Sequence, residues 1–426
     1  MDIKLDYGKH GLRLTLPDDA NVTVIQPTHV AALPDPMAAL RNALRHPIQS
    51  APLRDLVSAE DTVAIIFSDI TRATPSHLLI PAILEELSHV PADQITLCNA
   101  LGTHRENTPG ELAKMLGADI AARYRIEQNN CFDPTTQCYL GKSSRGHDIW
   151  INRAYMESSV KILTGFIEPH VFAGFSGGGK AVMPGMAGQV TILGDHDAGM
   201  IGNPKSTWGV THGNPIWEEV REVALMTSPT FLLNVTLNRE KQITGVFAGD
   251  LMAAHDTGIE FCRQTAMVPV GAPFDIVITT NSGYPLDMNL YQCAKGMSAA
   301  EQIVRQGGAI IMAAECSDGI PEHGLFGQML RAARTPQEMH DTIMSWAEPR
   351  LDQWTGQIQA RIQMKADVHL YSDYFDDAQT CAALLIPCDD IAATLEDLRG
   401  KYGQDARICV LPEGPLTIPY CSNGSA

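Results

Sequence analysis

Short runs of apolar residues, each about the length of a buried strand, recur along the chain. They lie at residues 63–67, 95–97, 160–163 and 276–279, and longer stretches with helical spacing of apolar positions separate them. Strands that alternate with helices in this way are typical of sheets whose strands run parallel. The pattern therefore predicts an α/β fold in which mixed or parallel sheets are flanked by helices.

Local signals place two of the helices. Residues 75–87 form a predicted helix with Thr74 as its N-cap and Pro75 in its first position, and residues 111–116 form another. The motifs described below fall mostly where predicted strands end.

Length and one proline-rich stretch predict two domains. A chain of 426 residues is too long for one ordinary core. Residues 267–273, with two prolines and a glycine, separate a helical pattern from a new strand. We therefore expect domains at 1–268 and 269–426, with the active site in the cleft between them. The last ~30 residues are expected to pack back on the first domain.

Charge and cysteine content narrow the classes of partner. The formal net charge of −18 argues against binding to nucleic acid or to an anionic membrane. No apolar run is long enough to span a bilayer, and the first residues do not resemble a secretory leader, so we expect a cytoplasmic protein. The ten cysteines include no C-x-x-C pair, which favours reduced, buried thiols.

Three consecutive glycines, Gly177, Gly178 and Gly179, stand directly before Lys180 and follow a predicted strand. Glycines allow backbone N–H groups to approach an anion closely, so one interpretation is a loop that holds a phosphate. The other is a tight turn with a solvated lysine, which is about as common.

The same stretch partly matches a P-loop. Residues 174–180 fit the spacing G-x-x-x-x-G-K, but Ala181 stands where the motif needs a Ser or Thr to hold magnesium. Pro184 and Gly185 would also end the following helix within a turn. A nucleotide hydrolase or phosphotransferase built on this loop therefore stays an alternative with one required residue missing.

Three histidines lie in loops that contain glycine or proline. They are His104, His170 and His196. Each alone fits an ordinary structural histidine, but three in such loops indicate a shared cleft. Imidazole exchanges protons near neutral pH and binds late first-row metals, so the set could serve acid-base chemistry, metal binding or both.

Two further segments offer cations for an anionic ligand. Asp69, Thr71 and Arg72 lie at a predicted strand-to-helix turn, where a guanidinium and helix amides can hold a carboxylate or phosphate. Tyr291 and Lys295 are four residues apart and would share one face of a helix. A solvated helix face explains that second pair equally well.

Together these segments resemble the lactate racemase family, whose members use a nickel-pincer nucleotide. Their order and approximate separations also fit that family, and the resemblance covers nearly the whole chain. The matching segments are Asp6-Tyr7-Gly8, Asp69/Thr71/Arg72, Gly-Thr-His104-Arg, Glu-Pro-His170, Gly-Gly-Gly-Lys180, His196 and Tyr291-Gln292-Cys-Ala-Lys295.

The resemblance implies a cofactor and a reaction. A nickel-bearing pyridinium mononucleotide would be attached to Lys180, with His196 as the protein ligand of nickel. A racemase or epimerase of this kind inverts C2 of a 2-hydroxycarboxylate by reversible hydride transfer through a 2-oxoacid. It also implies enzymes of cofactor biosynthesis as partners, and contacts to the cofactor from Asp69, Thr71 and the three glycines.

The resemblance assigns the remaining roles as well. His104 and His170 would be the two catalytic bases, one for each enantiomer of the substrate. Substrate binding would come from Arg72, Lys295, Tyr291 and Gln292. Trp354 would border the cofactor, although a packing indole is an equally good interpretation.

Two alternatives and the identity of the substrate stay open at this point. The P-loop alternative has no use for three loop histidines. A non-catalytic carrier of the nickel cofactor would need Lys180 and His196 but neither His104 nor His170. Within the family, the substrate could be lactate, malate, an aromatic 2-hydroxyacid or a sugar acid.

Overall fold

The computed structural model describes residues 1–321 and 324–422, which divide into two compact units. We call one the glycine-loop unit, because it contains Lys180 and the glycines before it. It consists of His29–His196 and Lys205–Arg263. The C-terminal unit consists of Met1–Thr28, Asp197–Pro204 and Gln264–Ala426.

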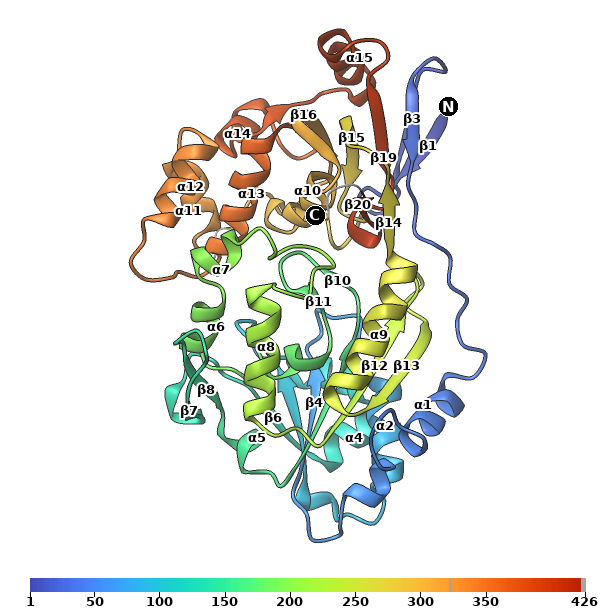
Figure 1. Cartoon of the computed structure of the whole chain (residues 1–426), viewed down its shortest axis with the longest axis vertical. Coiled ribbons are helices and arrows are strands. Elements are labelled where there is room, and N and C mark those ends of the chain that lie inside the picture. The colour runs from blue at the N-terminus through green and yellow to red at the C-terminus, as the bar shows by residue number, and fades with distance from the viewer. Residues whose placement is uncertain (322–323, 423–426) are drawn as a thin grey trace. The chain divides into compact units, whose positions relative to one another are not determined.

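The glycine-loop unit is built on a six-stranded sheet that is parallel except for one edge strand (Figure 1). It confirms the strands predicted at 63–67, 95–97 and 160–163. In spatial order the strands are β13 (Ile243–Gly249), β12 (Phe231–Leu237), β9 (Val160–Phe166), β4 (Val63–Ser68), β5 (Ile95–Ala100) and β6 (Arg125–Gln128).

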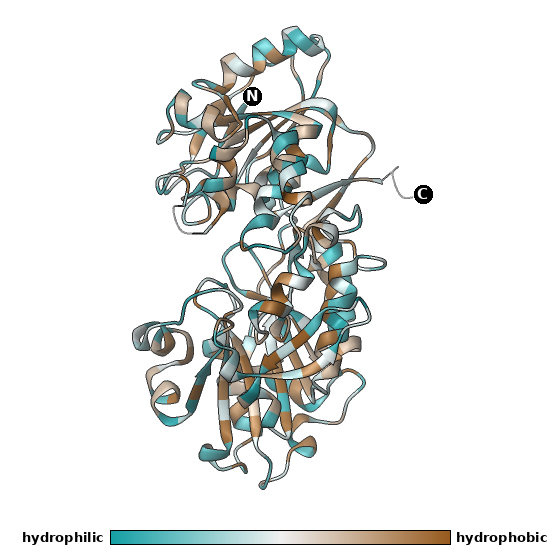
Figure 2. Cartoon of the chain, turned by 90° about the vertical axis from the view of Figure 1, so that its left-hand side faces the viewer, coloured by the Kyte–Doolittle hydropathy of each residue, from teal (hydrophilic) through white to brown (hydrophobic). Residues whose placement is uncertain are grey.

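Both faces of this sheet are covered. Val63, Ile65 and Phe67 of β4 pack in a core with residues of α1 (Pro36–Arg45) and α2 (Ser76–Glu86). Ala64 and Ile66, which alternate with these residues, are also fully buried, although successive side chains of a strand point to opposite faces. An uninterrupted apolar run is what a strand covered on both faces requires. Figure 2 shows apolar residues concentrated on the strands.

Two helices begin slightly away from their predicted starts. The helix predicted at 75–87 is α2, and it begins at Ser76 because Thr74 Oγ1 donates a hydrogen bond to Ser68 Oγ (2.9 Å) and does not cap the helix. The helix predicted at 111–116 is α3 (Pro109–Leu116). Thr108 and Glu111 form a reciprocal capping box at its start, which the sequence analysis missed.

The C-terminal unit contains a second six-stranded sheet, in which all strands run parallel. Its helices include α10 (Leu290–Glu301), α13 (Gln353–Lys365) and α15 (Ile391–Tyr402). In spatial order the strands are β18 (Ile386–Pro387), β17 (Ala366–Tyr371), β16 (Val304–Ala313), β15 (Phe274–Thr280), β19 (Arg407–Leu411) and β3 (Asn21–Val24).

The two units do not correspond to the predicted division of the chain at residue 268. The first 28 residues belong to the C-terminal unit, because β3 pairs with β19 at the edge of its sheet. Residues 407–411, expected to pack back on the first domain, belong to the C-terminal unit too, since β19 lies between β15 and β3. The stretch expected to be a linker forms β14 (Met267–Val270), which pairs with β20 (Ile418–Cys421).

The Asp6-Tyr7-Gly8 motif joins the first 28 residues to the rest of the C-terminal unit. The Tyr7 hydroxyl donates to Asp373 Oδ2 (2.8 Å), and the Gly8 amide donates to Asp287 Oδ2 (2.7 Å). Gly8 has a positive φ of 46°, and a Cβ there would lie 2.5 Å from Glu315 Oε1. The motif therefore has a structural role in this unit.

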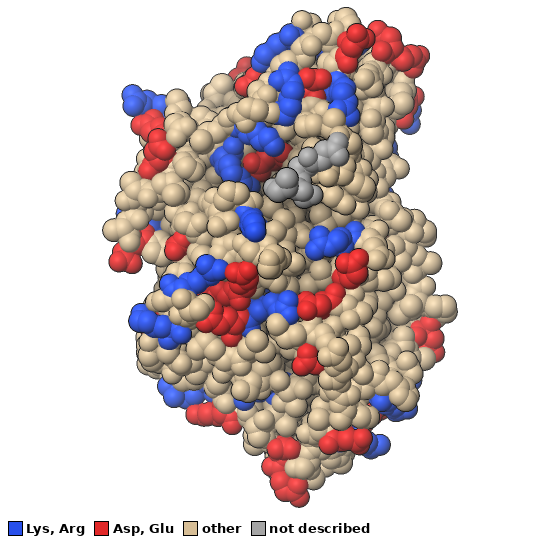
Figure 3. All heavy atoms as spheres, in the orientation of Figure 1, with Lys and Arg blue, Asp and Glu red and all other residues tan. Residues whose placement is uncertain are grey.

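The surface and the cysteines agree with the composition. On the face drawn in Figure 3, basic and acidic side chains are interspersed. Of the helices in the described residues, none has both the length and the apolar character that crossing a bilayer requires. All ten cysteines are free thiols, and most are buried.

Candidate active site

The candidate residues of the glycine-loop unit come from loops at one edge of its sheet. Asp69 and Arg72 follow β4, His104 follows β5, and His170 follows β9. Since β4 lies between β9 and β5 and the three strands are parallel, their carboxyl ends meet at the same edge. This edge is where open α/β sheets bind ligands.

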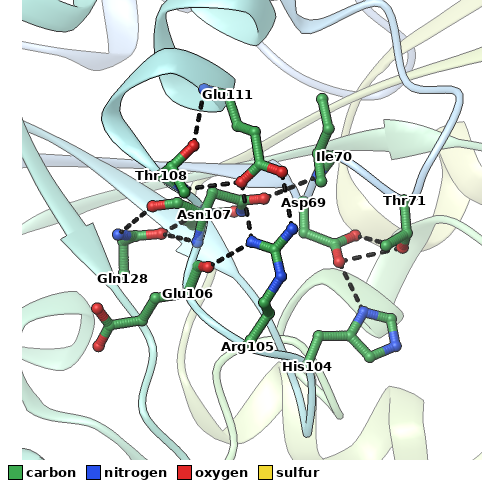
Figure 4. Close-up of polar contacts among 11 residues, drawn as sticks. Asp69, Ile70, Thr71, His104, Arg105, Glu106, Asn107, Thr108, Glu111 and Gln128 are labelled. Carbon is green, nitrogen blue, oxygen red and sulfur yellow. Dashed lines mark hydrogen bonds and ion pairs between the residues drawn. The ribbon is translucent and has the colours of Figure 1, made fainter.

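His104 and Asp69 form a close pair across two of these loops (Figure 4). His104 Nδ1 lies 2.6 Å from Asp69 Oδ2, and the Thr71 hydroxyl contacts both Asp69 oxygens at 3.0 Å. Burial works to raise the pKa of Asp69, but the hydrogen bond and charge of His104 and the charge of Arg72 outweigh it and hold the pKa below its usual value. Asp69 is thus a carboxylate that orients the imidazole.

This geometry assigns the ring hydrogen of His104. An ionised carboxylate only accepts hydrogen bonds, so Nδ1 carries the hydrogen and Nε2 of the neutral ring holds the lone pair. The side chain of His104 is 40% exposed, whereas that of Asp69 is 4% exposed. A base with a buried orienting partner and an accessible second nitrogen is the result.

Two amide side chains beside the pair, Asn107 and Gln128, link the two loops (Figure 4). The Ile70 amide donates to Asn107 Oδ1 (3.4 Å), which links the loop after β4 to the loop after β5. Gln128 of β6 accepts from the Asn107 amide (2.8 Å) and donates to its carbonyl (3.1 Å). The sequence analysis did not identify Asn107 or Gln128, because no motif marks them.

The neighbouring arginine of His104 is already paired. Arg105 contacts both carboxylate oxygens of Glu111 at 2.9 and 2.7 Å and donates to the carbonyl of Glu106 (2.8 Å). Glu111 also accepts from the Thr108 amide (2.8 Å) as part of the α3 capping box. Arg105 therefore serves the loop, and Arg72 is the cation that this segment offers to a ligand.

His170 has the opposite hydrogen-bonding pattern. It lies in the short hairpin of β10 (Pro169–His170) and β11 (Gly174–Phe175). Its Nδ1 accepts the backbone amide of Ala173 at 3.2 Å, so the hydrogen of the neutral ring is on Nε2. His170 and His104 are therefore not equivalent in this structure.

Lys180 lies in a short 3-10 helix, η4 (Gly178–Ala181), and is partly buried. Burial lowers the pKa of its ammonium group, the charge of Asp195 opposes this shift and the charge of Arg72 adds to it, so that the pKa is about 8. An amine with this pKa is partly neutral near pH 7 and can act as a nucleophile.

The three glycines are required by packing. The Gly178 amide donates to the buried Asn234 Oδ1 (2.7 Å), and a Cβ at Gly178 would overlap the ring of His255. A Cβ at Gly179 would lie 2.9 Å from the carbonyl of Val220. These contacts account for the glycines without a phosphate, and their predicted contact with the cofactor stays a prediction.

The P-loop alternative loses its helix. In the described stretch after Gly177, the structure has the four-residue η4, followed by turns through Pro184 and Gly185. A P-loop presents phosphates to the N-terminus of a full helix. The glycine-lysine spacing here therefore belongs to a different local structure.

His196 follows α6 (Gln189–Asp195) and is buried. Its Nδ1 lies 3.0 Å from the carbonyl of Ile192 and 3.2 Å from Asp195 Oδ2. With the hydrogen on Nδ1, Nε2 has the lone pair that a metal ligand needs. Asp195 itself is fully buried, which raises the pKa of its carboxyl group.

One aromatic ring joins three of the candidate residues. The buried Phe172 meets His170 edge-on at a centroid distance of 4.6 Å and His196 at 5.1 Å. Lys180 Nζ lies 5.8 Å from the centre of the same ring. Phe172 was not predicted as a site residue, because an apolar residue in a loop carries no distinctive motif.

The described residues hold no group of three or more His, Cys, Asp or Glu side chains that could bind a metal ion by themselves. A metal at His196 would therefore find at most one further ligand of these types in the described residues, which leaves coordination positions for a bound organic group. A single histidine near a lysine of lowered pKa fits such a tethered group. The nickel-pincer cofactor and the roles of Lys180 and His196 in holding it stay predictions.

The remaining predicted residues belong to the C-terminal unit, on α10. Tyr291 and Lys295 are on one helix, as predicted, and Asn289 caps it by accepting the Gln292 amide (3.1 Å). The Tyr291 hydroxyl is bound within this unit, where it accepts from Trp354 Nε1 at 3.0 Å. Burial raises its pKa to about 12, so Tyr291 stays protonated. The predicted ligand contacts of Tyr291, Gln292, Lys295 and Trp354 stay predictions.

Comparison with known proteins covers nearly the whole chain. Residues 7–209 match the lactate racemase N-terminal domain, and residues 270–418 match the lactate racemase C-terminal domain. The lactate racemase of Lactiplantibacillus plantarum is 37% identical over 380 residues, which are 88% of this chain and 89% of the relative. The lactate racemase of Thermoanaerobacterium thermosaccharolyticum is 33% identical over 423 residues, 98% of this chain and 99% of the relative.

Solved structures show the same likeness. The lactate racemase apoprotein from Thermoanaerobacterium thermosaccharolyticum superposes with a TM-score of 0.92 at 32% identity and covers 98% of this chain and 100% of that one. A protein from Thermotoga maritima shares the fold, with a TM-score of 0.69 at 17% identity over 92% of this chain and 100% of that one.

Proposed function

The chain belongs to the lactate racemase family, and on that premise we propose that it inverts C2 of a 2-hydroxycarboxylate, with lactate as the first candidate. The observation that carries the proposal is the His104–Asp69 pair, a base with a buried orienting carboxylate. His170, Lys180 and His196 of the same unit all contact one ring, Phe172.

The proposed cofactor is a nickel-pincer nucleotide attached to Lys180, with His196 as the nickel ligand. When bound, it would supply an acceptor for the hydride of C2. Lys180 would form the attachment through its amine, which the lowered pKa leaves partly neutral. His196 would offer Nε2 to the metal, because Nδ1 is engaged with the Ile192 carbonyl.

The proposed base for one enantiomer is His104. Its Nε2 takes the proton of the C2 hydroxyl as the C–O bond gains double-bond character, and the Asp69 carboxylate stabilises the imidazolium that results. His170 would serve the other enantiomer. To accept a proton at Nε2, its ring hydrogen must first move to Nδ1, which gives up the Ala173 amide.

Arg72 is the proposed anchor of the substrate carboxylate. Its Nε lies 4.0 Å from Asp69 Oδ1, its side chain is half exposed, and it follows the same strand as the base's partner. A guanidinium binds a planar carboxylate with two parallel hydrogen bonds, which would fix the orientation of C2. We retain Lys295, Tyr291 and Gln292 as proposed contributors to substrate binding.

A non-catalytic carrier of the cofactor is the weaker candidate. A carrier needs Lys180 and His196, but it has no use for an accessible imidazole held by a buried carboxylate. The relatives named lactate racemases favour lactate over malate, aromatic hydroxyacids or sugar acids. We further propose a cytoplasmic location and the enzymes of cofactor biosynthesis as partners.

Mass spectrometry with metal analysis tests the proposal. The protein is produced together with nickel-pincer biosynthetic enzymes, beside Lys180→Ala and a control, Lys114→Ala, which changes an exposed lysine of α3. We expect nickel and a nucleotide-sized adduct at Lys180 in the native and control proteins, and interconversion of D- and L-lactate in a chiral assay. Nickel with an adduct lost on denaturation would remove only the covalent attachment. Absence of nickel and nucleotide, while a known lactate racemase loads in parallel, would refute the proposal.

A further inference from the structure

One buried imidazole lies beneath the glycine loop and has no part in the mechanism above. His255 is on α9 (Leu251–Ala266), is 2% exposed, and packs against the indole of Trp217 at a centroid distance of 5.2 Å. Its Nε2 lies 2.9 Å from the carbonyl oxygen of Ser176. Burial lowers its pKa to about 4, so at neutral pH the ring is uncharged and Nε2–H donates to that carbonyl.

The same ring occupies the space that a side chain at Gly178 would need. A Cβ at this position would overlap Nδ1 and Cε1 of His255, so the loop closes on the imidazole only with glycine there. From the other side, the buried Asn234 Oδ1 accepts the Gly178 amide at 2.7 Å. Gly178 is therefore held between His255 and Asn234, two residues before Lys180.

Ser176 is held as firmly as Gly178. Its amide donates to the Glu168 carbonyl (2.8 Å), and its hydroxyl donates to the Phe166 carbonyl (2.9 Å). With the bond from His255, the amide, hydroxyl and carbonyl of Ser176 all have partners. The path of the chain into η4 is thus set before Lys180 is reached.

We propose that His255 is a positioning residue for Lys180, holding the loop so that the lysine amine stays in its partly dehydrated place. An apolar side chain of similar size would fill the core equally well, but it could not hold the Ser176 carbonyl. The inference rests on the proposed role of Lys180 as the attachment point of the cofactor. Its test is nevertheless independent of any cofactor.

The test compares the wild-type apoprotein with His255→Gln, whose amide can still donate, and with His255→Leu, which cannot. Acetic anhydride is the probe, and the pH midpoint of Lys180 acetylation is read by peptide mass spectrometry, with the exposed Lys114 as internal reference. Thermal unfolding is followed in parallel. A general loss of stability lowers the melting temperature but leaves the midpoint of a folded protein in place.

We expect a midpoint near pH 8 for wild type and His255→Gln, and a rise of a unit or more for His255→Leu. One unit means about tenfold less neutral amine at pH 7. Lys114 should titrate alike in all three. An unchanged midpoint in folded His255→Leu would overturn the proposal.

A second measurement covers the case in which His255→Leu does not fold. Gly178→Ala is placed in the wild-type and His255→Ala proteins, and urea unfolding gives the coupling between the two sites. The cost of the positive φ at Gly178 is common to both backgrounds, so the coupling reports the contact with the ring. We expect the alanine to lower the folding equilibrium constant at least about tenfold more when His255 is present. Equal effects in both backgrounds would contradict the contact.

Cofactor loading separates this inference from the proposed function. If wild type does not load while the acetylation midpoint still depends on His255, the proposed function fails and the positioning role stands. If wild type loads and the midpoint is indifferent to His255, the positioning role fails alone.

Discussion

Nδ1 of His104 lies 2.6 Å from Oδ2 of Asp69, across the ends of two neighbouring parallel strands. The carboxylate is buried and the imidazole is partly exposed, so the pair points from the interior of the unit toward solvent. Thr71 contacts both oxygens of the same carboxylate. The pair therefore fixes the tautomer of His104 with its hydrogen on Nδ1. The lone pair on Nε2 then lies at the edge of the sheet where a ligand would bind.

Replacing the carboxylate of this pair should damage catalysis without unfolding the protein. Asp69→Asn keeps the shape but can turn an N–H toward His104 Nδ1, which favours the wrong tautomer. We expect kcat for racemisation to fall by about 10²- to 10⁴-fold, the range of acid-base catalysis by one side chain. Glu111→Gln, which removes the charge opposite Arg105 but leaves an oxygen that can still accept the Thr108 amide, is the control. Equal activity of the two variants in a chiral assay would remove Asp69 from the mechanism.

Arg72 and Arg105 are close in sequence to the pair but should respond differently. Arg72→Gln is expected to raise KM for the hydroxyacid at least about tenfold, because it removes the guanidinium proposed to hold the carboxylate. Arg105→Gln should change KM little, since Arg105 is bound to Glu111 and to the Glu106 carbonyl. Initial rates over a range of substrate concentrations decide the matter, and a larger effect from Arg105 would reverse the assignment.

Phe172 should matter for the cofactor more than for stability. Phe172→Leu keeps most of the apolar volume, so the free energy of unfolding should change by less than about 1.5 kcal/mol. The ring that contacts both His170 and His196 is lost, however, and we expect about tenfold weaker retention of nickel. Phe231→Leu on β12 is the control, because that ring is also buried but does not contact His170, Lys180 or His196 in the structure. Nickel content is measured after dialysis, and urea unfolding is followed in parallel. If Phe172 only fills space, Phe172→Leu and Phe231→Leu should lose similar amounts of nickel.

The neutral, buried His255 makes stability depend on pH. Its folded pKa of about 4 lies below the unfolded value of about 6.5, so the unfolded chain binds the proton more readily. The stability it contributes is present above pH 6.5 and is lost as the pH falls toward 4, at up to about 1.4 kcal/mol per pH unit. His255→Gln has no such group. Urea unfolding of both proteins at several pH values should show that the free energy of unfolding falls more for wild type than for His255→Gln as the pH is lowered. An equal fall in both proteins would contradict the buried neutral state.

Much of the glycine-loop unit could be predicted from local patterns. The apolar runs at β4, β5 and β9 are strands, and in parallel strands the following loops share an edge. Once the structure places β4 between β9 and β5, the loops that carry Asp69, His104 and His170 must lie at that edge. The period of a strand or helix is a local property, which is why single segments carry it.

Other features depended on contacts between distant segments. The glycines before Lys180 suggested a phosphate, but the structure shows Asn234, Val220 and His255 packed where their side chains would be. The first 28 residues joined the C-terminal unit through the pairing of β3 with β19. Neither contact leaves a mark in the sequence near the residues concerned.

The sequence by itself therefore determined the α/β class, the four apolar strands at 63–67, 95–97, 160–163 and 276–279, the family and the residue types available for chemistry. Only the tertiary structure decided that Asp69 orients His104, that Phe172 joins His170, Lys180 and His196, and where the two units divide. The physical reason is that periodicity and turn chemistry act between neighbours in the chain. Hydrogen bonds and packing join residues far apart in sequence. Which residues meet depends on the spatial order of the strands in each sheet.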